Sequence, residues 1–449
     1  MRYNLFNNKT IRWKIAALLC LVSGLNCLDR NTLAILAATI QAEFSWTDAD
    51  YADITAVFVF SYTLMYAFSG RIIDWIGTKK GFTIFAGGWS LVSLLHAFAS
   101  TITQFSIARF FLGITESGNF PGGVKASTEW FPLKERALAI GIFNAGTAIG
   151  AAIAVPIVSF LALYFGWRAA FFVTGLLGFI WLYFWVKHYH SPKDHPKITK
   201  EEKDLILQDE TKECAGEAAL HDETSSSAQE KNHRNEAKKT PPTIKLKQLL
   251  ARKETWGCFS ARIFIDPVTY FLLFWIPKYL QDVQGLSLSE LGVTAWLPYT
   301  AMGIGTILGG VLPRYLINHY SWSLNKARKT VMIAASLIIP ALCYLLFSGI
   351  STVWAIASIS GVMLAHGLWA NITIPSEIYP KSVQATITGI GGTLGGVTSV
   401  ISQKMIGATI ATYSYLPVFF YIGAAYIVSF IFVSILVGRL GVIREFKNN

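Results

Sequence analysis

The sequence has little of what a soluble enzyme needs. Only 14% of its 449 residues are charged, whereas 53% are hydrophobic, which is far from the composition of a soluble domain. It also lacks a Gly-x-Ser-x-Gly turn, a phosphate-binding loop and a soluble catalytic domain. We therefore expect neither enzyme activity nor a cofactor or metal site.

Cysteines are also few, and their positions indicate no special chemistry. The five do not stand at the spacing of a disulfide framework or a metal site. Four of them lie in apolar runs, and all are interpreted as packing residues: Cys20, Cys27, Cys214, Cys258 and Cys343.

Long apolar segments, by contrast, recur along nearly the whole chain. At about 20 residues per span they predict roughly twelve transmembrane helices, so the expected fold class is an all-α membrane protein. The net charge of +11 does not indicate nucleic acid, because the basic residues fall in alternate loops, as the positive-inside rule describes. This distribution predicts that both termini and the central loop are cytoplasmic and that the partner is the lipid bilayer.

Two charged residues, Arg109 and Glu116, lie seven positions apart inside an apolar segment. In a helix they point to one face and are separated by roughly 10 Å along the axis. An ionisable group at bilayer depth is costly unless it faces a partner or a water-filled cavity. The pair is therefore interpreted as a functional site; the alternative is a structural ion pair that only locks two spans together.

The first span, about residues 13–40, is apolar except for Asp29, Arg30 and Asn31 near its middle. Adjacent residues differ by about 100° around a helix, so Asp29 and Arg30 cannot share a direction. One can face a cavity while the other reaches a neighbouring helix. The alternative is that the two charges neutralise each other locally.

Three glycine pairs with a spacing of four predict close helix contacts. We interpret them as sliding surfaces between two halves of the molecule: Gly146 with Gly150, Gly305 with Gly309, and Gly392 with Gly396.

A polar segment divides the chain into an N-terminal half at 1–190, a linker at 191–255 and a C-terminal half at 256–449. Thr199 and Glu202 are spaced as a capping box for a short helix that runs to about Asp209. The stretch 212–240 has almost no apolar residues and is predicted to be disordered.

An internal repeat supports two related halves. The chain reads EWFPLKERALAIGI from Glu129 and EIYPKSVQATITGI from Glu377, at an offset of 248. A parallel duplication of six-helix halves would place a substrate between them at mid-membrane. The second half is expected to carry no buried counterpart of Arg109 or Glu116, and Asp266 lies about two turns into its span, where water can still reach it. Ion coupling is therefore expected in the first half.

The turn after the second span resembles a loop of the major facilitator superfamily. There the loop between the second and third helices latches the two halves together. The resemblance implies a gating role for the matching residues, which are Gly70, Asp74, Gly77, Lys79 and Lys80.

Longer phrases are similar to the anion:cation symporter family of that superfamily. They include TESGNFPGGVKASTEWFPLKERA, GWRAAFFVTGLLGFIWL and DPVTYFLLFWIPKYL, and they look most like bacterial hexuronate transporters. The resemblance implies a monomer in the inner membrane that imports glucuronate or galacturonate with protons. Another sugar acid, sodium coupling and a transporter-like receptor are the alternatives. Thr147 replaces a glutamine of galactonate carriers, which favours a hexuronate.

The same resemblance implies residue roles. Asp29 and Glu116 match the carboxylates that bind protons in that family. Arg30 matches the arginine that binds the substrate carboxylate, and Arg109 matches the arginine that links the substrate site to the proton site. The expected substrate-lining residues are Tyr62, Asn144 and Thr147 and, by helix position only, Tyr270, Trp369, Asn371 and Thr393.

Physical chemistry supports these roles independently. Arginine stays charged and grips a carboxylate as a fork, and shielding a carboxylate from water favours its protonated form. Moving a monoanion into an interior-negative cell costs about 2.3 kcal/mol per 100 mV. A concentrating importer of anions therefore needs a cation that moves with the substrate.

Overall fold

A computed structural model describes residues 10–206, 246–369, 374–379 and 381–440, and within them every regular element is a helix. The prediction of an all-α protein is confirmed. Nine helices of the described part are long and apolar enough to cross a membrane. The expected total of about twelve, the cytoplasmic termini and the boundaries of the halves stay predictions. The stretch 212–240 and Asn371 lie outside the described residues.

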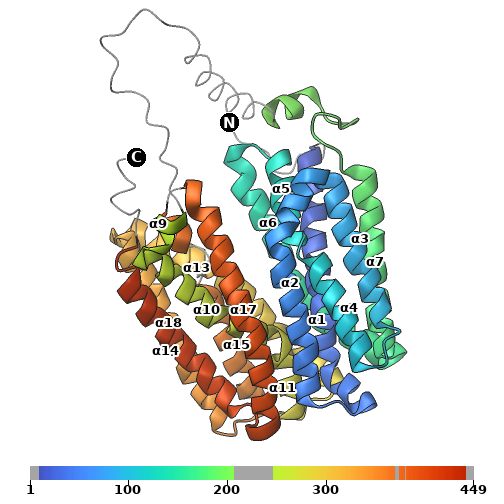
Figure 1. The fold of residues 1–449 in the computed structure, drawn as a ribbon, viewed down its shortest axis with the longest axis vertical. Coiled ribbons are helices and arrows are strands. Elements are labelled where there is room, and N and C mark those ends of the chain that lie inside the picture. Colours follow the sequence, from blue (N-terminus) through green and yellow to red (C-terminus); the bar gives the residue numbers. More distant parts are fainter. Residues whose placement is uncertain (1–9, 207–245, 370–373, 380, 441–449) are drawn as a thin grey trace, which may run out of the picture.

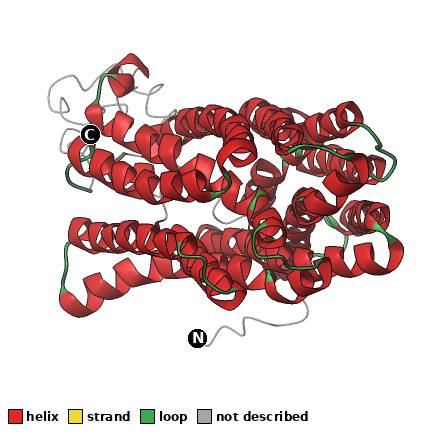
Figure 2. Cartoon of the chain, turned by 90° about the horizontal axis from the view of Figure 1, so that it is seen from below, coloured by secondary structure: helices red, strands yellow, loops and turns green. Residues whose placement is uncertain are grey.

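The helices form two groups that lie side by side (Figures 1 and 2). The first helix group contains α1 (Ile11–Phe44), α2 (Asp48–Ile76), α3 (Thr78–His96), α4 (Ile102–Glu116), α5 (Asn119–Trp130), α6 (Leu133–Phe165) and α7 (Trp167–His188). Its main packing pairs are α1 with α6, α2 with α4, and α3 with α7.

The second helix group begins with α9 (Leu246–Leu250), α10 (Lys253–Phe274), α11 (Ile276–Asp282), α12 (Leu288–Thr294) and α13 (Trp296–Tyr320). It continues with α14 (Leu324–Phe347), α15 (Thr352–Trp369), α16 (Ile374–Ile378), α17 (Lys381–Tyr413) and α18 (Leu416–Leu436). Its main pairs are α13 with α15 and α10 with α17.

Local sequence explains how the chain enters its second and third helices. Thr47 and Asp50 form a reciprocal capping box that begins α2, which satisfies backbone donors that a helix start leaves unpaired. Gly77 has φ of +87°, a conformation that glycine adopts without steric cost. It therefore ends α2 and begins α3 in a single-residue turn.

The two groups contact each other where α1 ends and α2 begins, at the lower end in Figure 1. Tyr51 donates a hydrogen bond of 2.7 Å to the carbonyl of Phe274. Gln403 of α17 accepts hydrogen bonds from the hydroxyl of Thr55 and the indole of Trp275. These buried polar contacts tie α2 to α10 and α17 at this end of the molecule.

The glycine pairs do permit close helix contacts, but mostly inside one group. An added Cβ at Gly146 would lie 2.0 Å from the carbonyl oxygen of Cys20 in α1, and one at Gly305 would lie 2.1 Å from that of Leu364 in α15. Gly150 and Gly309 pack on the same two helices. The interpretation as a sliding surface between halves is therefore wrong for these four glycines.

Of the three glycine pairs, only Gly392 with Gly396 includes a glycine that contacts the other helix group. An added Cβ at Gly396 would lie 2.3 Å from the side chain of Thr63 on α2, whereas the nearest neighbour at Gly392 is Arg262 of α10. Among these six glycines, Gly396 therefore makes the close contact between the groups.

The residues that follow the first helix group are anchored to it. Residues 200–206 are helical, and Thr199 accepts a hydrogen bond from the backbone N–H of Glu202. The Glu202 carboxylate does not complete the expected capping box; it accepts hydrogen bonds from the backbone N–H groups of Ile11 and Arg12 at 3.0 Å each. A residue far along the chain thus caps α1.

Candidate functional site

The centre of the first helix group holds a buried ion pair between α1 and α4. The Nε of Arg30 lies 2.8 Å from Oε2 of Glu116, with side-chain exposures of 15% and 0%. A second guanidinium nitrogen, Nη2, donates to the side-chain oxygen of Asn26 at 3.3 Å. A fully buried carboxylate is tolerated because the arginine pairs with it.

Arg109 points toward the same place but does not pair with Glu116. Its Nη1 donates to the backbone carbonyl of Arg30 at 3.2 Å, and its guanidinium lies 5.8 Å from the ring centre of Phe58. Within the described residues, its Nε and Nη2 have no partner, and neither has Oε1 of Glu116. Buried polar atoms are nearly always satisfied, so this unmet capacity makes the cluster a candidate functional site.

Asp29 faces away from Arg30, toward α3 and α7. Its Oδ1 accepts a hydrogen bond of 2.7 Å from Ser93, whose hydroxyl also lies 3.3 Å from that of Thr174. The expected difference in direction is confirmed, and local neutralisation of Asp29 by Arg30 is wrong. Asp29 is 1% exposed, and its Oδ2 has no partner among the described residues.

Aromatic residues from both helix groups surround Arg30. The guanidinium carbon lies 4.9 Å from the ring centre of Tyr62 and 5.5 Å from that of Phe58. Tyr62 stacks on Tyr66 at 5.9 Å. Tyr270 of α10 lies 5.7 Å from Phe274, whose ring centre is 5.9 Å from that of Phe58. The structure therefore brings Tyr62 and Tyr270 together with the charged cluster.

Three other predicted lining residues lie on exposed helix surfaces. Asn144 and Thr147 are on α6, where the Thr147 hydroxyl lies 2.6 Å from that of Ser23. Thr393 is on α17 and donates to the carbonyl of Gly389. Nothing in the described part joins them to Arg30 by a hydrogen bond, so their role stays a prediction.

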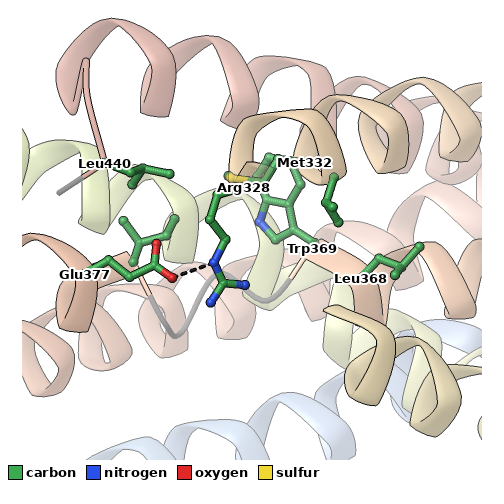
Figure 3. Close-up of a pocket in the computed structure, with 8 residues that line it drawn as sticks. Arg328, Met332, Leu368, Trp369, Glu377 and Leu440 are labelled. Atoms are coloured by element: carbon green, nitrogen blue, oxygen red, sulfur yellow. Dashed lines mark hydrogen bonds and ion pairs between the residues drawn. The ribbon is translucent and has the colours of Figure 1, made fainter. Parts of the chain in front are cut away.

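Trp369 lies elsewhere, inside the second helix group. It is 2% exposed and packs against the ring of Tyr426. It lines a small pocket beside Arg328 and Glu377, whose side chains form an ion pair (Figure 3). The structure does not bring Trp369 to the cluster around Arg30.

The loop with the predicted gating role is tied to its own helix group. Asp74 forms an ion pair of 2.8 Å with Lys125 of α5, and Lys125 also donates to the carbonyl of Ile73. Lys80 is exposed and Lys79 partly so. In the described part of the chain, Asp74 makes no ion pair with the second group, so a latch between halves at this loop stays a prediction.

Sequence reasoning missed charged residues in the second helix group. Lys278 is 5% exposed and pairs with Asp48 of α2 at 2.8 Å and with Asp282. Arg262 pairs with Asp266 at 2.8 Å. The expectation that the second half carries no buried counterpart of Arg109 or Glu116 is therefore wrong, since Lys278 is buried, and Asp266 is not simply solvated.

Signals for two of these pairs were present in the sequence. Arg262 and Asp266 are four residues apart, the spacing of a pair on one helix face. Glu377 is the repeat equivalent of Glu129, but only the fold brings Arg328 to it. Lys278 and Asp282 have the same spacing of four, but nothing in the sequence predicts that Lys278 also pairs with Asp48, because Asp48 belongs to the other helix group.

Comparison with known proteins agrees with this architecture. A family model described as Major Facilitator Superfamily matches residues 19–403. The chain is 32% identical to the hexuronate transporter of Escherichia coli (strain K12) over 412 residues, covering 92% of this chain and 90% of that protein. It is also 32% identical to the galacturonate transporter of Dickeya chrysanthemi over 334 residues, covering 74% and 90%.

A solved structure of the xylose transporter XylE from E. coli, in an inward open conformation, has a similar fold. The TM-score is 0.69 at 13% sequence identity, and the match covers 95% of this chain and 96% of that one. At this level of identity the likeness concerns the fold alone.

Proposed function

We propose that this chain, which belongs to the major facilitator superfamily, imports a sugar-acid monoanion, a hexuronate such as glucuronate or galacturonate, by proton symport. It is a multi-pass membrane transport protein and not an enzyme. The observation that carries the proposal is the buried ion pair between Arg30 and Glu116. The names of the two relatives support the substrate class.

The ion pair offers a direct way to couple a proton to an anion. In the structure the fork of Arg30 is occupied by the Glu116 carboxylate at 2.8 Å. A substrate carboxylate that binds Arg30 has to compete with Glu116. Protonation of Glu116 removes that competition, so proton binding and substrate binding strengthen each other, and by linkage the effect is reciprocal.

Asp29 and Arg109 extend this coupling. Asp29 is buried and accepts a hydrogen bond from Ser93, and no cation of the described residues forms an ion pair with it. A buried charge without a partner is costly. We assign Asp29 as a second proton acceptor. Arg109 binds the backbone of Arg30, and we assign it the role of linking the substrate site to the proton site. One proton makes import of a monoanion electroneutral, and two let the membrane potential assist it.

The contacts between the groups support alternating access. Lys278 and Asp48 join the groups at the end where α2 begins. If the opposite end is cytoplasmic, as the charge distribution predicts, this arrangement is the inward-facing state of a monomer in a bacterial inner membrane. The outward-facing state then requires this contact to break.

The test is a counterflow assay in proteoliposomes with labelled glucuronate or galacturonate. The pH gradient and the sodium gradient are varied separately. We expect exchange of a hexuronate and accumulation that follows the pH gradient alone. Accumulation with sodium would assign a different coupling ion, exchange of only another sugar acid such as galactonate would assign another substrate, and binding without exchange would indicate a receptor.

A further inference from the structure

A buried asparagine beside Arg30 has no role in the proposed function so far. Asn26 lies on α1, one turn before Arg30, and is 4% exposed. Its side-chain oxygen, Oδ1, accepts a hydrogen bond of 3.3 Å from Nη2 of Arg30. Its amide nitrogen, Nδ2, has no partner among the described residues. Burying an amide N–H without a partner is costly, so a protein that keeps one needs a reason for it.

The orientation of the Asn26 amide follows from the chemistry of its neighbour. The oxygen and nitrogen of an asparagine side chain look alike in shape, and the hydrogen bonds decide which is which. Arginine has only donors, so the atom of Asn26 that meets Arg30 has to be the acceptor oxygen. Both atoms belong to one small planar group, and Nδ2 therefore offers its N–H donors close to the same guanidinium.

Arg30 is held by two partners of different charge. Its Nε pairs with the Glu116 carboxylate at 2.8 Å, and its Nη2 donates to the neutral amide of Asn26. A guanidinium has more N–H donors than these two partners use. A ligand carboxylate that displaces Glu116 thus binds a guanidinium that Asn26 already holds from another side, and Asn26 does not compete with it as an acidic residue would.

Asn26 also belongs to a polar stripe along α1. Spacings of three and four place Ser23, Asn26 and Arg30 on one face of the helix. The Ser23 hydroxyl lies 2.6 Å from that of Thr147, an exposed residue of α6. Seven helical residues rise about 10 Å, which is long enough to contact a hexuronate along its whole length. The stripe connects Thr147, a predicted lining residue, with Arg30.

We propose that Asn26 is a further substrate-binding residue, and that its Nδ2 donates a hydrogen bond to the carboxylate that Arg30 binds. The inference rests on the proposed function, because it uses Arg30 as the carboxylate site. Asn26 keeps its contact with Arg30 when substrate binds, whereas Glu116 is exchanged for the substrate. The substrate carboxylate then receives hydrogen bonds from a cation and from a neutral amide, and both are charge-assisted because the acceptor is ionised.

The experiment measures equilibrium binding of labelled galacturonate to the purified full-length protein between about pH 6 and about pH 8, the range around neutrality in which a shielded carboxylate can titrate. Asn26→Leu removes the amide at similar volume. Asn26→Asp keeps the shape but replaces the donor by an oxygen that is negative when ionised. Thermal stability without ligand shows whether each variant is folded, and the second variant keeps the test valid if the first does not fold.

Asn31 provides the matched control. It is also buried on α1, at 1% exposure, but its amide donates to the sulfur of Cys27 at 3.4 Å and makes no hydrogen bond with Arg30 in the described part of the chain. Asn31→Leu and Asn31→Asp therefore make the same changes at a similar depth on another face of the helix.

We expect Asn26→Leu to weaken galacturonate binding about tenfold at every pH, the usual effect of losing a hydrogen bond to a charged group. Asn26→Asp should weaken it more than about tenfold at about pH 8. This loss should become smaller toward about pH 6, because the introduced carboxylate has to take up a proton before it can donate to the substrate. The Asn31 variants should stay within about threefold of the wild type throughout, since they remove no contact with Arg30 or substrate.

Wild-type affinity in Asn26→Leu, or a loss in Asn26→Asp that is the same at every pH, would overturn the inference. A loss in Asn26→Leu that changes with pH would show that Asn26 acts only through the Arg30–Glu116 pair, which would overturn its role as a donor. Equal losses in Asn31→Asp and Asn26→Asp would overturn it as well, since any buried charge would then suffice. A wild type that binds no hexuronate would instead contradict the proposed function itself.

Discussion

The two helix groups each contain a partly or fully buried arginine–glutamate pair between helices, and their surroundings differ. Arg30 and Glu116 join α1 to α4 with the glutamate fully buried, and the Phe58 ring beside Arg30 packs against Phe274 of the other group. Arg328 and Glu377 join α14 to α16, and Arg328 also donates to the carbonyl of Gly309 in its own group. Only the first pair lies where the groups meet.

The comparison shows that the neighbours of a buried charge, more than its burial, decide what it can do. Arg30 lies against aromatic rings of α2, one of which packs on the other group, and beside the Glu116 carboxylate, of which one oxygen has no partner among the described residues. The neighbours of Arg328 are Met332, Trp369 and other residues of the second group (Figure 3). Arg328 is therefore interpreted as holding helix ends together.

The largest expected effect is on Arg30. Arg30→Ala should abolish hexuronate binding while the protein stays folded, because the substitution removes the cation that binds the substrate carboxylate. Lysine should restore binding poorly, since it lacks the planar fork. Binding is measured by displacement of labelled galacturonate.

The matched control for that comparison is Arg328→Ala. It should lower the thermal stability but keep ligand affinity within a few-fold, because breaking a buried pair strands a charge at roughly 3–5 kcal/mol. Equal losses of binding in both variants, or wild-type affinity in Arg30→Ala, would remove the distinction between the two pairs.

The second prediction concerns Glu116. Glu116→Gln imitates a permanently protonated acid, so accumulation driven by a pH gradient should be lost while exchange of substrate across the membrane is kept. Counterflow and gradient-driven uptake in the same proteoliposomes separate the two activities. A variant that still accumulates substrate would show that Glu116 does not couple the proton, and a variant that only loses stability would indicate a structural pair.

The third prediction concerns the contact between the groups. Lys278→Met should favour opening at the end where α2 begins, because Lys278 pairs with Asp48 of the other group in a buried position. A cysteine introduced at Thr55, which is 3% exposed where α2 meets α17, should react with a soluble thiol reagent several-fold faster in a Lys278→Met background than with Lys278 present. Lys404 pairs with Asp53 in an exposed position, and Lys404→Met should change the rate little, since exposed pairs contribute about 0–1 kcal/mol. Equal rates in the presence and absence of Lys278 would exclude a role in closure.

The smallest effect is expected in the linker. Replacing 212–240 by a Gly/Ser linker of equal length should leave uptake near the wild-type level, because so polar a segment cannot form a core of its own. Uptake is compared at equal amounts of the protein in the membrane, and a large loss of uptake would show a gating or regulatory contact.

Glu202→Ala is the contrasting change at a described residue near the linker. It should destabilise the protein by about 1 kcal/mol, since Glu202 caps α1.

Much of the local structure could be predicted from the sequence. The apolar runs predicted an all-helical membrane protein, because a helix is the simplest way to satisfy the backbone inside a bilayer. The angle between adjacent helical residues predicted that Asp29 and Arg30 point in different directions, and spacings of four predicted close contacts at glycines. Each of these inferences depends on residues close together in the chain.

Partners, in contrast, were decided by the tertiary structure. Glu116 pairs with Arg30, 86 positions away, and not with Arg109 on its own helix. Lys278 is buried only because α11 packs beside Asp48, and Gly396, unlike Gly146, contacts the other group. Helical periodicity determines the direction of a side chain, but its contact partner depends on how distant helices pack. That packing is set by the sum of favourable contacts over the whole interface between two helices, and one residue does not determine it.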